Sequence, residues 1–537
     1  MKYSLALLVA LSAIGCSSDS EPGTPVVLGA VIDQTGNNSE LSWLQAVELA
    51  LGQFNDALAA EGQTGFHFKL SPQNSENDVV GGADSRAINR IRDTVRDGAR
   101  AATIDTTQIA EEANKPGVTD ELQIPMQCSS CTGGSFLSAT ASVPTDADLQ
   151  ASRRNSQFWM SRTIMSTGLQ AQVVAQLIRA SPNGGDVNGD GIIKVQTYGS
   201  DEAFGQATTT AVATELLKLV PRDQQSRVVF ERKLHNNAQD PRDIDFSTDI
   251  DGMLDAQNVD LTPTNGNYPN NPHFNTNPPP TGQTALPPPE PDLLPAQPDY
   301  IAVATFGRND VQFITNIKGR NLPGLGSSIR VVHFQTFRFS SNLLVLGELA
   351  EGEIGVSHVV KDGPTGDQFA TDFQAKFGLV PVYRDAIYYD NAMTMLLGMF
   401  TAMQDAAAPD QITGVQVRNA MPCSSVNAAR AYAPTCTPVP PATTCVARPE
   451  TSCPAGADIT PVGPGIDNIR IAIRTIQARQ PIEYTGASGP VDYDALGNIK
   501  NRVALFTVRG GRYEDIATFD CVNSNTCPCI SGECPGQ

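Results

Sequence analysis

The sequence is short of positive charge and of histidine. It has 37 Lys and Arg residues against 57 Asp and Glu residues, a formal net charge of −20, and five scattered histidines. Proteins that bind the phosphate backbone of nucleic acid need a surplus of positive charge, so no nucleic-acid partner is expected. The acidity favours solubility and says little about the fold.

The usual catalytic and nucleotide-binding motifs are also missing. The sequence contains neither G-x-G-x-x-G nor G-K-[ST], so a dinucleotide or P-loop site lacks its glycines and its lysine. It contains neither G-x-S-x-G nor H-E-x-x-H. We therefore expect a protein that is not an enzyme and requires no cofactor.

The first 25 residues have the pattern of an export signal followed by a polar tether. Lys2 supplies a positive start, Leu5 to Leu11 an apolar core, and small residues lead to Cys16. A cysteine directly after the cleavage site resembles a bacterial lipobox. We predict a signal peptide over 1–15 and a tether over 16–25 that is lipidated at Cys16; ordinary cleavage with an unmodified cysteine is the alternative. The mature chain would then be anchored to a membrane without spanning it, either on the periplasmic side or in the outer membrane.

The eleven cysteines support export, because removing Cys16 leaves ten that can pair. An exported chain meets an oxidising compartment, where clustered cysteines form disulfides. Zinc is the weaker interpretation, since no histidine stands at ligand spacing from any cluster. The clusters are Cys128/Cys131, then Cys423, Cys436, Cys445 and Cys453, then Cys521, Cys527, Cys529 and Cys534.

Between these ends, strand-like and helix-like segments alternate. This order predicts an α/β fold built of βαβ units, with parallel sheets covered on both faces. The turns that follow the strands then meet at the carboxyl edge of each sheet, where ligands bind. The expected strands are 26–32, 65–71, 99–105, 124–128, 157–162, 193–200, 227–234, 299–306, 329–335 and 353–359; the helical patterns include 77–98, 166–180, 202–220 and 384–403.

Three stretches break the alternation. Residues 258–298 are rich in Pro and Asn and are predicted to form a surface insertion without a packed core. Residues 422–464 form a second insertion, rich in Cys and Pro, and residues 521–537 a Cys-rich tail. Both are expected to be held by their own disulfides.

The ordered set of segments resembles the type I periplasmic solute-binding proteins, specifically the branched-chain amino-acid-binding branch. No single motif is diagnostic, but the set covers most of residues 26–519 outside the insertions. The matching stretches are "VLGAVIDQTGNNSELSWLQAVELALGQFN", "INRIRDTVRDGARAATIDTTQIAEEA", "IPMQCSSCTGG", "FWMSRTIMSTGLQAQ", "YRDAIYYDNAMTMLL" and "GPVDYDALGNIKNRVALFTVRGGRYEDI".

The resemblance implies two Rossmann-like α/β lobes joined by three crossovers, with a small polar solute bound between them. The first lobe would take residues 26–162 and 360–490. The second lobe would take residues 163–359 and 491–520.

The resemblance also implies which residues hold the ligand. They lie in loops after strands, and two aromatic residues and a glutamine come from the second lobe. The alternative for the Ser and Thr residues is helix capping, and for the aromatic residues core packing. The candidates are Gln34, Thr35, Asp105, Thr106, Thr107, Ser129, Ser130, Thr132, Phe204, Phe306 and Gln335.

One departure from the family concerns the α-amino group of an amino-acid ligand. Relatives bind it with acidic groups, but this chain has the neutral Thr167, Gln335 and Thr336 near those positions. Asp201 and Glu202 are the nearest acidic alternatives. An ammonium without a carboxylate partner in a closed cleft is costly, so we expect weak binding of leucine-like ligands.

Two further motifs have chemistry of their own. Cys128 and Cys131 have the C-x-x-C spacing of redox enzymes, although a local disulfide that stiffens the ligand loop is the simpler interpretation. "DVNGDGIIK" resembles the start of a calcium loop, with Asp186, Asn188, Asp190 and the Ile192 carbonyl as candidate ligands. The closing Glu of such loops is missing, and a polar turn is the alternative.

Two functions follow from these expectations. The first is a lipid-anchored receptor that captures a small polar solute for an ABC permease or a sensor. The second is an envelope scaffold that uses the same fold to bind a protein partner. The first is the expected function, and the second is the alternative, for which the two insertions and the missing acidic partner count somewhat.

Overall fold

The computed structural model describes most of the chain outside its N-terminus and its insertions. The predicted signal peptide and Cys16, nearly all of the 258–298 insertion, and residues 426–457 of the second insertion lie outside the described residues. The described residues are 23–35, 40–76, 82–133, 159–236, 244–254, 298–319, 330–425, 458–494, 497–524 and 526–536.

The first lobe is built on a five-stranded sheet in which every neighbouring pair is parallel. One of its inner strands runs "TPVVLGAVI", and an apolar run of this kind suits a strand that is covered on both faces. In spatial order the strands are β2 (Phe66–Asn74), β1 (Thr24–Ile32), β3 (Ala99–Ile104), β4 (Met126–Cys128) and β5 (Met160–Arg162).

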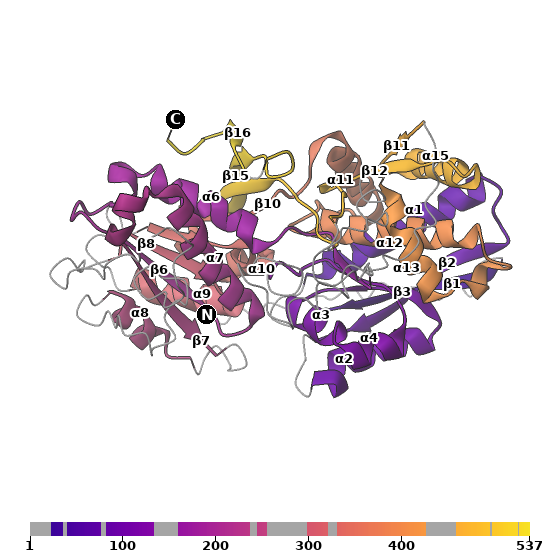
Figure 1. Cartoon of the computed structure of the whole chain (residues 1–537), viewed down its shortest axis with the longest axis horizontal. Coiled ribbons are helices and arrows are strands. Elements are labelled where there is room, and N and C mark those ends of the chain that lie inside the picture. The colour runs from indigo at the N-terminus through magenta and orange to yellow at the C-terminus, as the bar shows by residue number, and fades with distance from the viewer. Residues whose placement is uncertain are drawn as a thin grey trace, which may run out of the picture.

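Helices cover both faces of this sheet. One face carries α2 (Arg86–Arg96), α3 (Thr107–Ala113) and α4 (Pro116–Leu122). The other carries α1 (Leu41–Ala60) and the fully buried α12 (Asp385–Met403), with a small sheet of three strands beside them (Figure 1). The remaining elements of this face are α11 (Gly363–Phe377), α13 (Gly414–Ala420), α15 (Ile466–Gln477), β11 (Thr460–Val462), β12 (Ile482–Gly486) and β13 (Gly489–Pro490).

The second lobe contains an eight-stranded sheet that is mixed, not parallel throughout as expected. The neighbours from β7 to β10 are parallel, whereas β14, β15 and β16 run antiparallel to their neighbours. The short turn at Gly510 and Gly511 explains the pair β14 and β15, because such a turn can join only antiparallel strands. The order is β16 (Cys529–Gly532), β15 (Arg512–Phe519), β14 (Val503–Arg509), β10 (Ile354–His358), β9 (Arg330–His333), β8 (Tyr300–Ala304), β6 (Ile193–Ser200) and β7 (Val228–His235).

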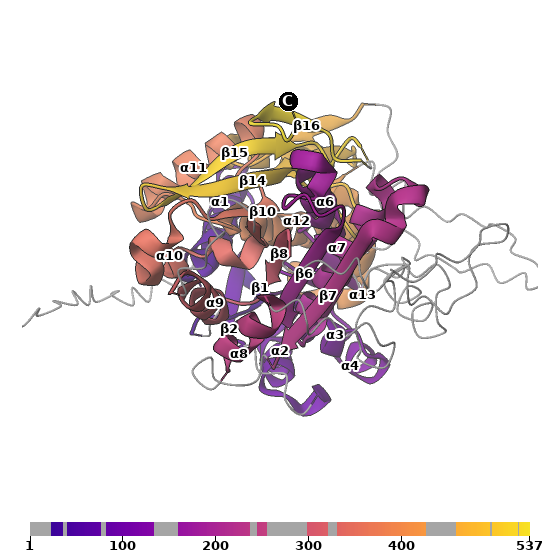
Figure 2. The same ribbon diagram turned by 90° about the vertical axis from the view of Figure 1, so that its left-hand side faces the viewer.

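Helices also cover both faces of the second sheet, as Figure 2 shows from the end of the molecule. α6 (Thr167–Arg179) and α7 (Ala203–Leu219) lie on one face. α8 (Phe246–Leu254), α9 (Arg308–Gly319) and α10 (Ser340–Leu346) lie on the other. The Cys-rich tail adds β16 to the edge of this sheet, and its disulfides join Cys521 to Cys527 and Cys529 to Cys534.

The chain passes between the lobes three times. It leaves the first sheet after β5, returns after β10, and crosses again before β14. Val491, Tyr493 and Ile499 still pack in the core shared by α1 and α12, so the third crossing lies close to Val503. The two-lobe α/β fold and its three crossovers are as predicted.

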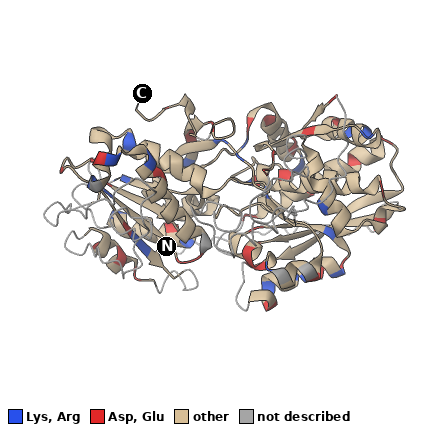
Figure 3. Ribbon diagram, in the orientation of Figure 1, with Lys and Arg blue, Asp and Glu red and all other residues tan. Residues whose placement is uncertain are grey.

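The ten expected strands correspond to β1 through β10 with small shifts at their ends. Figure 3 shows acidic and basic residues interspersed along the outer helices of both lobes. None of the helices in the described ranges has the length and apolar character needed to cross a membrane.

Candidate functional site: a cavity between the lobes

A cavity of about 350 Å³, counted with its opening to solvent, lies where the two lobes face each other. Most of this volume is the opening: the enclosed space is about 20 Å³, about the size of one water, so a solute enters only when the lobes or the wall side chains move apart. The lining comes from strand-end loops of both sheets, from α1 and from the turn before α12. The lining residues are Trp43, Asp105, Thr106, Thr107, Gln108, Ser130, Thr132, Phe204, Phe306 and Arg384.

The loop after β3 supplies the centre of the first-lobe wall. Asp105 is 1% exposed, and its carboxyl accepts hydrogen bonds from the Asp33 backbone (2.5 Å) and from Ser75 Oγ (3.4 Å). Burial and the neighbouring Asp33 raise the pKa of Asp105 to about 8, so this carboxyl holds a proton at neutral pH. Thr106 caps α3 by accepting the Ile109 N–H at 3.4 Å, which is the capping role considered for it.

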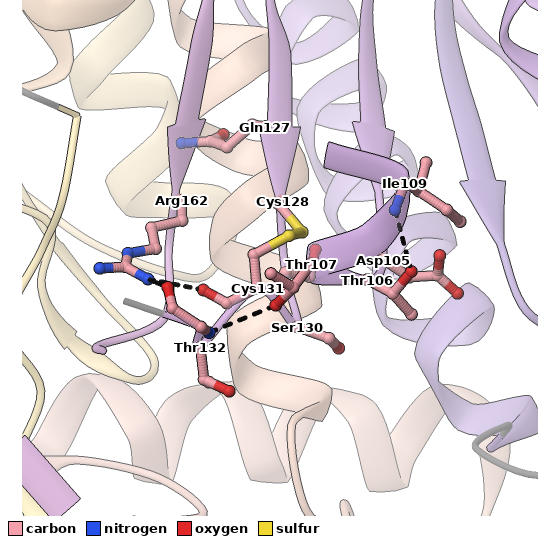
Figure 4. The surroundings of a disulfide bond; sticks show 12 residues. Asp105, Thr106, Thr107, Ile109, Gln127, Cys128, Ser130, Cys131, Thr132 and Arg162 are labelled. Atoms are coloured by element: carbon pink, nitrogen blue, oxygen red, sulfur yellow. Dashed lines mark hydrogen bonds between the residues drawn. A yellow bond between two sulfur atoms is a disulfide. The ribbon is translucent and has the colours of Figure 1, made fainter. Parts of the chain in front are cut away.

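The loop after β4 is held by a disulfide between Cys128 and Cys131 (Figure 4). Buried Arg162 donates hydrogen bonds of 2.9 Å to the carbonyls of Cys131 and Gly133. The Gly133 N–H donates to Thr107 Oγ1 at 3.3 Å, so the loops after β3 and β4 are tied together. These contacts fix Ser130 and Thr132 at the cavity wall.

The second lobe contributes a pair of phenylalanines. Phe204 begins α7, Phe306 follows β8, and their ring centroids lie 4.9 Å apart. Glu202 caps α7 by accepting the backbone N–H groups of residues 204 and 205 at 2.9 Å. Its carboxylate also accepts hydrogen bonds from Ser200 Oγ and from Gln108 Nε2, both at 2.6 Å, and the second of these crosses between the lobes.

Trp43 and Arg384 complete the lining. Trp43 stacks on Tyr388 with ring centroids 4.9 Å apart. The Arg384 guanidinium lies over the rings of Tyr383 at 4.8 Å and Trp43 at 5.7 Å. Arg384 is 4% exposed and stands at the start of α12.

Seven of the predicted ligand residues line this cavity, and their role in binding stays a prediction. Four others are placed elsewhere. Gln34 and exposed Thr35 are held at the end of β1 by Asn74, and the Ser129 hydroxyl accepts from Asn391 inside the first lobe. Gln335 is fully buried, and its side-chain oxygen accepts from Tyr383 at 2.9 Å.

Several contacts hold the two lobes together around the cavity. Gln335 donates to Thr132 Oγ1 at 2.5 Å. Glu40 accepts from the backbone and the hydroxyl of Ser340 at 2.8 and 2.7 Å. Together with the Gln108–Glu202 contact, these bonds describe lobes that are closed on each other.

The predicted calcium loop lies between α6 and β6, on the second lobe away from the cavity. Its carboxylates are directed at its own backbone: Asp186 accepts from the N–H groups of Gly189 and Gly191, and Asp190 accepts from that of Ile192. Asn188 accepts the Asp190 N–H at 2.9 Å. Among the described residues no group of three or more Asp, Glu, His or Cys side chains is arranged to hold a metal. The calcium site stays a prediction.

Sequence analysis missed Trp43, Gln108 and Arg384 as cavity residues. One feature of the sequence could have indicated Arg384. A cation at the start of a helix interacts unfavourably with the helix dipole, which indicates a role other than stabilising the helix. Trp43 gave a weaker indication, because the chain has only two tryptophans. Gln108 gave none, since it lies one residue beyond the predicted loop.

Comparison with known proteins gives matches in structure alone. No protein-family model matches the sequence, and the search of curated proteins found no match. The structure is similar to a leucine-binding protein from Thermotoga maritima (13% identity, TM-score 0.54, 92% of this chain and 98% of that one). It is also similar to a branched-chain amino acid transporter substrate binding protein from Streptococcus pneumoniae in complex with isoleucine (11%, 0.53, 91% and 98%). A third is an ABC transporter solute binding protein from R. palustris in complex with benzoate (12%, 0.54, 96% and 99%).

Identities this low show the fold and nothing further. The two-lobe fold of the type I periplasmic binding proteins, predicted from the order of the sequence segments, is thereby confirmed.

Proposed function

We propose that this chain is an exported solute-binding protein that captures a small polar solute between its lobes and presents it to an ABC-type importer or a sensor. The observation that carries the proposal is the cavity itself, since its lining comes from the strand-end loops of both sheets. Ligands of open α/β sheets bind at these carboxyl ends. The solved structures of similar fold, which hold isoleucine or benzoate, support the same class of function.

The mechanism is a change in the balance between open and closed lobes. Cross-lobe hydrogen bonds such as Gln108–Glu202 and Gln335–Thr132 join the lobes here and would break if the lobes moved apart. A ligand that contacts both walls adds to them and shifts the population toward closure. Lipidation of Cys16 would keep this receptor at a membrane surface.

The cavity favours a solute receptor over the alternative of an envelope scaffold. A scaffold has no need of a space lined by hydroxyls, aromatic rings and a buried guanidinium. The two functions make opposite predictions for small ligands.

The test is a thermal-shift screen of the protein against amino acids, amides, carboxylates and sugars. A ligand at a hundred times its dissociation constant stabilises by about 2.7 kcal/mol, which raises the melting temperature visibly. Phe306→Ala, in the cavity wall, is expected to weaken the response. Phe377→Ala, an equally half-buried phenylalanine on α11, is the matched control. A folded protein that responds to no member of the set would overturn the proposal in favour of the scaffold.

A further inference from the structure

Arg384 occupies an unusual backbone position. Its φ of +74° is left-handed, a conformation that is strained for a residue with a side chain. The turn is held by Asp385, whose carboxylate accepts the Val382 N–H at 2.6 Å and whose own N–H donates to the Val382 carbonyl. The turn therefore fixes the arginine at the cavity wall at the start of α12.

The guanidinium of Arg384 has no counter-ion. Within the described part of the chain it forms no ion pair, its Nε has no hydrogen-bond partner, and its one side-chain hydrogen bond is with Tyr383. Its surroundings are rings: Tyr383, Phe339 at 5.4 Å and Trp43. Cation–π contacts offset a part of the desolvation free energy of a buried cation. An anion bound beside the guanidinium would offset the remainder.

A second buried arginine shows what a structural role looks like in this protein. Arg338 is 5% exposed and forms an ion pair with Asp515 at 2.5 Å, and it donates to Ser357 Oγ at 2.8 Å. Arg384 is as deeply buried, its side chain is hydrogen-bonded to Tyr383 and to no carboxylate among the described residues, and it faces a cavity.

No ionised carboxylate lines the cavity at neutral pH. Asp105 is the single acidic residue of the lining, and burial beside Asp33 keeps it protonated because its pKa is about 8. Glu202 does not line the cavity: its side chain is turned to Ser200, Gln108 and the start of α7, and burial raises its pKa. An anion entering the cavity therefore meets one guanidinium, a protonated carboxyl and the hydroxyls of Thr106 and Ser130.

The rest of the lining selects what carries that anion. Trp43, Phe204 and Phe306 present aromatic surface, which an inorganic anion would leave in contact with water. An apolar body attached to the anion would fill this space. An ammonium group would need Asp105 to lose its proton in a buried site, which is costly.

We propose that the ligand is a small monocarboxylate with an apolar or aromatic body, whose carboxylate binds Arg384 and whose body packs between Trp43 and the pair Phe204 and Phe306. The inference rests on the proposed solute-binding function and names its ligand class. An α-amino group is not required.

The test compares acids with their own amides by calorimetry on the full chain. The probes are benzoate against benzamide, and 4-methylpentanoate against its amide and against leucine, which adds the α-amino group. A charge-assisted bond contributes on the order of 10- to 100-fold in affinity, so each acid should bind tighter than its amide by that factor. Leucine should bind no tighter than 4-methylpentanoate.

Two variants assign the effect to Arg384. Arg384→Met should abolish the preference for acid over amide, and Arg384→Lys should retain part of it. Arg418→Met is the matched control, because Arg418 also lies over an aromatic ring, Trp159 at 4.4 Å, and does not line the cavity. Unliganded Arg384→Met should melt no lower than the parent, since it removes an unpaired buried charge.

The outcomes separate the two levels of the proposal. Amides that bind as tightly as acids, or leucine that binds where 4-methylpentanoate does not, would overturn the ligand class and leave a solute receptor. An acid preference that survives in Arg384→Met would remove the arginine from the site. A folded protein that binds none of these probes and no sugar, amine or peptide would overturn the proposed function itself.

Discussion

Asp105→Asn is expected to stabilise the unliganded protein, and increasingly so as the pH rises. The folded-state pKa of Asp105 is about 8, against an ordinary value of 3.8 for an aspartate, because the carboxyl is buried beside Asp33. A raised pKa on an acid means that folding must keep a proton that the unfolded chain has already lost. The penalty begins near the unfolded pKa, grows with pH, and levels off above the folded pKa.

The magnitude follows from that window. Between pH 5 and pH 7 the unfolded carboxyl is ionised and the folded one is protonated, so the parent loses about 1.4 kcal/mol per pH unit relative to the amide. The gap in unfolding free energy between Asp105→Asn and the parent should therefore widen by about 2.7 kcal/mol over these two units. The amide oxygen can still accept the Asp33 N–H, so the geometry of the loop is preserved.

The assay is urea unfolding of both proteins at pH 5, 6 and 7 without ligand. Asp458→Asn, at an exposed position, is the control and should show no widening. A gap for Asp105→Asn that stays constant across this range would refute the argument that a protonated carboxyl stands in the cavity wall.

Three further predictions concern positions around the two lobes. Cys128→Ser should lower the unfolding free energy by about 2 kcal/mol, as expected for a short disulfide loop. It should also weaken ligand binding, because Ser130 and Thr132 are then held less firmly. A thiol–disulfide exchange activity that is lost in this variant would instead favour the redox interpretation. Asp390→Ala should lower the unfolding free energy measured in urea by about 3–5 kcal/mol. The reason is that the Asp390 side chain accepts hydrogen bonds of 2.6–2.8 Å from Tyr484, Ala487 and Ser488. A decrease in unfolding free energy below about 1 kcal/mol would contradict this. Calcium added after chelation should raise the melting temperature if the Asp186 loop binds it, and Asp186→Asn should cancel the rise; an unchanged melting temperature would remove the calcium site.

The sequence was a good guide to every part of the cavity that follows a strand. Alternating strands and helices place the ends of β3, β4, β6 and β8 at sheet edges, so Asp105, Ser130, Phe204 and Phe306 could be expected near a shared space. The contributions of Trp43 and Arg384 depend on how α1 and α12 pack against each other, which no local pattern encodes. Gln335 was expected to follow the same rule as the strand-end residues.

Gln335 departs from that rule for a physical reason. The chain after β9 turns into a short 3-10 helix, Gln335–Arg338, which directs the amide toward Tyr383 and Thr132. A glutamine there serves the contact between the lobes. The direction of a turn after a strand depends on tertiary packing, so its side chains could not be assigned from the sequence.

The threefold passage between the lobes has a consequence for how this protein folds. Each lobe combines an early and a late stretch of chain: the first needs the buried α12, and the second needs β14, which pairs with β10. A chain of which only the part up to β10 is available for folding therefore has neither core complete. Contacts so distant in sequence slow folding and leave apolar surface uncovered meanwhile. A cut at any one crossing would yield two fragments that each lack part of a core, and not two separable domains.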